Sequence, residues 1–127
     1  MGAILGVWAA HLMFAEPVLQ ISTKAREGLP QGFAEAVATF GLVGTSLGSL
    51  RFRPEATPTL VGLYIAAAYW FTASTSFANP AVTVARSLSD TFAGIAPASA
   101  PMFIAGQLAG GVLGVAVFSW LPVRRSR

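Results

Sequence analysis

The short segment that begins at Asn79-Pro80-Ala81 constrains the fold most, because it follows an apolar run yet is itself too short to cross a bilayer. Asn caps helices well and Pro fits the first helical turn, so residues 80–89 are predicted to form a helix that starts at Asn79. A broken helix at membrane depth is tolerated only inside protein or beside a watery cavity. The N–H groups at its start carry about half a positive charge, which favours polar solutes and disfavours cations. The segment therefore predicts part of a pore lining.

The composition of the whole chain is that of a membrane protein. Hydrophobic residues make up 54% of the sequence and charged residues only 10%, whereas about a quarter of a typical soluble domain is charged. Four apolar runs predict transmembrane spans at about residues 2–21, 32–50, 58–75 and 102–121. The first run is short for the roughly 20 residues that a crossing requires, so we expect a truncated first span. The expected fold is one all-α membrane domain over residues 1–127, with four spans and one re-entrant half-helix.

The basic residues predict the orientation of the chain. Arg51 and Arg53 lie two crossings away from the cluster Arg124, Arg125 and Arg127, so both groups are expected on one face. That face is cytoplasmic by the positive-inside tendency, which places the C-terminus inside and the loop around Lys24 outside. These cations flank apolar runs and form no patch interleaved with aromatic residues, which argues against nucleic-acid binding. The absence of cysteine excludes disulfides and thiolate metal sites.

Small residues recur at the spacing with which membrane helices pack closely. In lipid, small residues four apart let helix backbones approach one another. The pattern predicts a tight bundle and occurs at Gly2 and Gly6, at Gly44 and Gly48, and at Gly106, Gly110 and Gly114.

Two motifs together resemble the second half of a major intrinsic protein, the aquaporin and aquaglyceroporin family. They are Ser76-Phe77-Ala78-Asn79-Pro80-Ala81-Val82-Thr83 and, one span earlier, Glu35-Ala36-Val37-Ala38-Thr39-Phe40. The resemblance covers the chain from the family's third transmembrane helix onward, and implies the second half of an inverted repeat. It also implies that the N-terminal half of the channel, with its own NPA-type motif, is missing. A complete channel of this family is expected to be a homotetramer that passes small neutral solutes without a cofactor, a metal or catalytic residues.

The resemblance assigns roles to particular residues. Asn79, Pro80 and Ala81 would form the pore motif, and Glu35 would accept hydrogen bonds from the backbone of the re-entrant loop. An ionisable residue in a span is also expected to face the bundle interior and find a partner there. The alternative is that Glu35 lies near the outer interface and is solvated. His11 is expected to be a packed, hydrogen-bonded residue more often than a ligand or a proton switch.

The selectivity filter departs from the usual family pattern at Val82, where most members have Arg. The next arginine is Arg86, one helical turn further along. An i,i+4 ion pair with Asp90 explains Arg86 as well as a role in the filter does. The resemblance places Ala67 and Ser76 at the other filter positions of this half, and a shift of one residue replaces Ser76 by Phe77. A small, uncharged lining resembles aquaglyceroporins of bacterial arsenic-resistance operons. The expected solutes are water, glycerol and arsenous acid, and the expected location is the bacterial inner membrane.

Two other functions compete with a channel. A secondary transporter would also place a broken helix at the midplane, but apart from Glu35 the spans contain no acidic or basic coupling residue. The chain is alternatively a non-conducting membrane fragment of a truncated or split gene. An enzyme is not expected, because the sequence has one His, no Cys and no convergent set of titratable groups at membrane depth.

Overall fold

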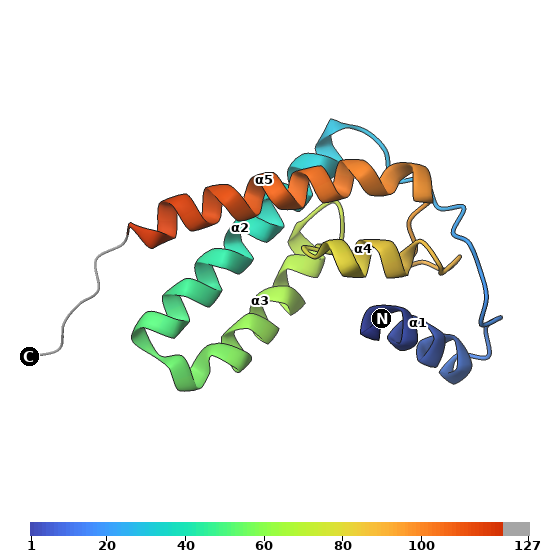
Figure 1. Cartoon of the computed structure of the whole chain (residues 1–127), viewed down its shortest axis with the longest axis horizontal. Helices are drawn as coiled ribbons and strands as arrows, with labels where there is room; N and C mark the ends of the chain where they lie inside the picture. The colour runs from blue at the N-terminus through green and yellow to red at the C-terminus, as the bar shows by residue number, and fades with distance from the viewer. Residues whose placement is uncertain (121–127) are drawn as a thin grey trace, which may run out of the picture.

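The computed structural model describes residues 1–120, and every regular element within them is helical (Figure 1). The α-helices are α1 (Gly2–Met13), α2 (Leu29–Phe52), α3 (Thr57–Phe71), α4 (Pro80–Arg86) and α5 (Ala100–Ser119), with 3₁₀ turns at Pro54–Ala56 and Pro97–Ser99. The all-α expectation is confirmed. Two helical segments are long and apolar enough to cross a membrane: α2 (Leu29–Phe52), and Pro97–Ser119, which joins the second 3₁₀ turn to α5. The count of four spans stays a prediction.

The centre of the fold is the pair α2 and α5, which lie side by side in Figure 1 with α3 folded back beside α2. A Cβ atom at Gly106 would collide with the carbonyl oxygen of Gly32, and one at Gly110 with that of Ala36. The glycine face of α5 therefore packs directly against the backbone of α2, as the spacing predicted. Three other glycines have nothing within 4 Å of an added Cβ in the described chain, so for them close packing stays a prediction: Gly2, Gly6 and Gly48.

Helix α1 is shorter than the sequence indicated, because it ends at Met13 and does not continue to residue 21. Pro17 disfavours a helical conformation at Glu16 and has no N–H to donate, and Ala15 already has a left-handed φ of 56°. Residues 15–28 then run without helix along the bundle (Figure 1). Twelve helical residues span only about 18 Å.

Helix α4 ends at Arg86, three residues earlier than expected, and carbonyls at its end accept hydrogen bonds from other segments. The carbonyl of Ser87 accepts a hydrogen bond from Ser22 N at 2.8 Å, and that of Arg86 accepts one from Ile95 N at 3.3 Å. Both donors come from loops that cross the end of the helix. Helix α3 ends at Phe71, also before its predicted limit at residue 75.

Arg51, in the last turn of α2, binds the end of α5. Its Nη1 donates to the carbonyl of Phe118 at 2.6 Å and its Nη2 donates to that of Ser119 at 3.1 Å. A cation is favourable at this position, where the last carbonyls of a helix carry partial negative charge. The ends of α2 and α5 therefore lie at the same end of the bundle, which agrees with counting crossings in the sequence. The arginines at 124, 125 and 127 lie outside the described residues.

Candidate pore-lining site

Asn79 caps α4 in the way the sequence predicted. Its backbone is extended, with φ −158° and ψ 119°, and its Oδ1 accepts from the N–H groups of Ala81 at 2.8 Å and Val82 at 3.4 Å. Asn79 and Pro80 are exposed. Within residues 1–120 the Nδ2 group of Asn79 has no hydrogen-bond partner, so it is available to donate to a solute.

The loop before Asn79 has an unfavourable backbone conformation. Thr75, Ser76 and Ala78 have φ values of 63°, 50° and 49°. A left-handed conformation costs a residue other than glycine about 1–3 kcal/mol, and it persists only where the surroundings hold it. This loop therefore depends on anchors from other elements.

Glu35 on α2 is the first anchor. Its Oε1 accepts from Phe77 N at 2.9 Å, and its Oε2 accepts from Ala78 N at 2.8 Å and from Gln107 Nε2 at 2.7 Å. All three partners donate, which suits an ionised carboxylate because that group offers only acceptors. Glu35 is fully buried, so the alternative of a solvated residue at the interface is wrong.

Gln107 on α5 is a second anchor, which the sequence analysis missed. Its Nε2 donates to Thr83 Oγ1 at 2.8 Å as well as to Glu35, and the Thr83 hydroxyl donates to the carbonyl of Asn79 at 3.0 Å. Gln107 is the eighth of the twenty residues of α5, so the first turn of α4 lies near the middle of that helix (Figure 1). A lone amide in a long apolar helix was an available signal, because polar groups in such helices are retained for a partner.

Arg26 is a third anchor, from the segment between α1 and α2. Its guanidinium donates from Nε to Gly94 O at 2.8 Å, from Nη2 to Phe92 O at 3.0 Å and from Nη1 to Ser74 O at 3.2 Å. Burial lowers the pKa of Arg26, but the ordinary pKa of a guanidinium lies so far above neutral pH that the group stays charged. Arg26 thus fixes the loops on both sides of α4 to one another. The sequence analysis assigned Arg26 no role.

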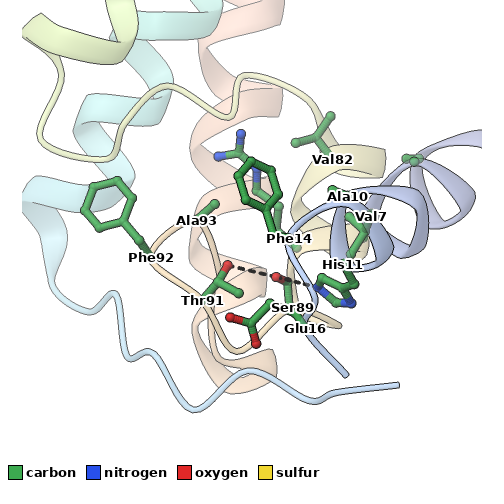
Figure 2. A pocket seen from close by; sticks show the side chains of 14 residues that line it. Val7, Ala10, His11, Phe14, Glu16, Val82, Ser89, Thr91, Phe92 and Ala93 are labelled. Atoms are coloured by element: carbon green, nitrogen blue, oxygen red, sulfur yellow. Dashed lines mark hydrogen bonds between the residues drawn. The ribbon is translucent and has the colours of Figure 1, made fainter. Parts of the chain in front are cut away.

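The four predicted filter residues do not come together in the described chain. Val82 lines a cavity of about 680 Å³ between α1 and α4, where Figure 2 shows it opposite side chains of α1. Ser76 is buried in the loop, and Phe77 is buried in a core with Ile95 and Phe103. Ala67 is exposed on α3.

His11 is a packed and hydrogen-bonded residue. Its Nδ1 donates to Val18 O at 3.0 Å, and its Nε2 is hydrogen-bonded to Ser89 Oγ at 2.9 Å. Ser89 in turn contacts Thr91 Oγ1, and Figure 2 shows this chain of bonds. His11 therefore ties α1 to the end of α4.

The ion pair considered between Arg86 and Asp90 is absent from the described chain. Asp90 instead accepts from the backbone N–H of Thr23 at 2.7 Å and from its hydroxyl at 2.9 Å. These two bonds lower the pKa of the Asp90 carboxyl. Arg86 lies with its guanidinium carbon 4.3 Å from the centre of the Phe77 ring.

The chain is 57% identical over 120 residues to Aquaglyceroporin AqpS of Rhizobium meliloti (strain 1021). The chain belongs to the major intrinsic protein family. The match covers 94% of this chain and 52% of the relative, so the chain spans about half the length of the curated relative it matches. No family model matches the chain, and no solved structure matches it.

Membership of the major intrinsic protein family implies an integral membrane protein and points to a channel rather than an enzyme. It also accounts for the large apolar side chains that remain exposed on the helices, among them Leu63, Trp70 and Val112. Such residues are expected where a helix faces lipid or another part of a channel.

Proposed function

We propose that this chain forms one half of a passive channel for small neutral solutes. The start of α4 carries the proposal: Asn79 uses its Oδ1 as the helix cap and keeps an exposed Nδ2 with no partner in the described chain. The N-terminus of the helix adds partial positive charge at the same place. Together these groups stabilise polar, uncharged solutes and disfavour cations.

The other half of the channel is proposed to cover α5 beside Pro80. A groove of about 470 Å³ there is mostly apolar and is lined by Thr39, Pro80, Gln107, Leu108, Gly111, Val112 and Val115. This other half is proposed to be a polypeptide equivalent to the part of the Rhizobium relative that this chain does not match. By family resemblance the complete channel is a homotetramer.

Val82, Ser76 and Ala67 are proposed as the filter positions of this half. The ring of Phe77 packs against Phe103, with 5.1 Å between ring centres, and this inward position favours Ser76 over Phe77 as the lining residue. A filter of small uncharged side chains suits glycerol and arsenous acid as well as water. The printed name of the relative, an aquaglyceroporin, supports this class of solute.

The proposed location is the bacterial inner membrane with the C-terminus in the cytoplasm. The bacterial source of the relative supports a location in a bacterial inner membrane. The contact of Arg51 with the end of α5 supports the orientation, because it places this basic residue at the end of the bundle where α5 ends.

A chimeric channel tests the function. The unmatched half of the Rhizobium relative is fused to this chain, and glycerol and water flux into proteoliposomes is measured by stopped-flow light scattering. We expect glycerol uptake by the chimera and none above protein-free liposomes by this chain alone, since a single half-helix cannot close a pore. A folded, membrane-inserted chimera without glycerol flux would refute the proposal and favour a non-conducting membrane protein.

A further inference from the structure

We propose that Arg86 supplies the filter with the positive charge and the hydrogen-bond donor that Val82 cannot provide. This inference rests on the proposed function, because it concerns the selectivity of the same pore. It assigns to this channel a wide filter that still excludes cations.

The register of α4 puts the two residues on one face. Val82 and Arg86 are four residues apart in the helix, and both line the cavity between α1 and α4. Side chains on a helix lean toward its N-terminus, so a long side chain covers the turn that precedes its own Cα. Arg86 is therefore directed back over the turn that contains Val82.

The contact with Phe77 fixes how far back the guanidinium reaches. Phe77 precedes α4, and its ring centre lies 4.3 Å from the guanidinium carbon of Arg86. Val82 packs against the same core cluster as Phe77. The charge of Arg86 thus lies near the level of Val82, although its Cα lies one turn further along the helix. Cation–π attraction favours this position.

The guanidinium of Arg86 retains a donor for a solute. Its Nη1 is buried and has no hydrogen-bond partner among residues 1–120. Asp90, the acid expected to neutralise it, is engaged by Thr23, and Glu16, which lines the same cavity, makes no ion pair with Arg86 among residues 1–120. The buried Glu35 is engaged by three donors, and the neighbouring Arg26 adds a second positive charge beside Phe77.

The consequence is a separation of size selection from charge selection. Val82 leaves the lumen wide, while Arg86 repels cations and offers Nη1 to an oxygen atom of a neutral, hydroxyl-bearing solute.

The chimeric channel tests this with variants at position 86 at matched protein levels. Arg86→Met removes the charge, Arg86→Lys keeps it, and Lys24→Met removes a charge from the neighbouring loop as a control. Sodium leak into proteoliposomes and glycerol uptake are measured together. We expect Arg86→Met to raise sodium leak about tenfold or more while glycerol still passes, with Arg86→Lys and Lys24→Met close to the parent. The double variant Val82→Arg, Arg86→Met should restore exclusion of sodium.

Three results would overturn the inference. One is an Arg86→Met channel that passes glycerol and excludes sodium like the parent. Another is equal leak in Arg86→Met and Arg86→Lys, which would indicate a packing role. The third is loss of glycerol flux in an Arg86→Met channel that is folded and inserted at the parent level. A parent chimera without glycerol flux instead overturns the proposed function itself.

Discussion

Replacing Glu35 by Gln tests the anchor of the re-entrant loop. The carboxylate accepts from Phe77 N, Ala78 N and Gln107 Nε2, whereas an amide offers one oxygen in place of two and adds a donor. At least one buried N–H then loses its acceptor, at a cost of about 1–3 kcal/mol. The left-handed residues nearby add to the tendency of the loop to open. We expect the loop to become less stable by about 2 kcal/mol.

The opening of the loop is measured by cysteine labelling. The sequence has no cysteine, and Ser76 is only 6% exposed, so Ser76→Cys is a single probe that reacts when the loop opens. A free-energy change of about 2 kcal/mol corresponds to a labelling rate roughly 30-fold higher in Glu35→Gln.

The control for this experiment is Glu27→Gln, which removes a carboxylate from an exposed position of the preceding loop. Its labelling rate should match that of the parent. If Glu35→Gln labels at the parent rate while its helix content is unchanged, the carboxylate does not hold the loop and the reasoning is wrong.

Three further predictions concern packing, filter and topology. Gly110→Ala should lower the free energy of unfolding by about 1–3 kcal/mol, because the added methyl group separates α5 from α2. Gly48→Ala should be neutral or slightly stabilising, because nothing lies within 4 Å of the added methyl group. Thermal unfolding in detergent compares the two variants. In the chimera, Val82→Arg should reduce glycerol uptake by a larger factor than water uptake, and an equal reduction of both would show that position 82 is not in the filter. Ala25→Cys and Ser126→Cys should label from opposite faces of a membrane with an impermeant reagent, and labelling of both from one face would contradict the orientation.

Local rules predicted the features that depend on neighbouring residues. The cap at Asn79 follows from the preference of Asn and Pro for the start of a helix, and the oxygen of Asn79 makes the expected bonds. The close packing of α5 at Gly106 and Gly110 follows from spacing alone. Both signals are contained within one turn or one helix face.

Tertiary contacts decided the features that the sequence did not predict. Arg26 binds three carbonyls from two loops, and nothing in its neighbours indicates that the loops meet there. The direction of Arg86 depends on the position of Phe77, not on Asp90 four residues away. The end of α1 could have been placed better, because Pro17 was visible in the sequence and disfavours helix at Glu16.

The most direct test of the central claim is whether the Val82 face of α4 lines the conduction path. Val82→Cys is placed in a chimera whose other cysteines are replaced, with Leu63→Cys on the exposed side of α3 as the control. Glycerol uptake is then recorded before and after a bulky, membrane-impermeant thiol reagent. The account predicts that the reagent blocks uptake through Val82→Cys and leaves Leu63→Cys unaffected. Unchanged uptake through a fully labelled Val82→Cys channel would contradict it.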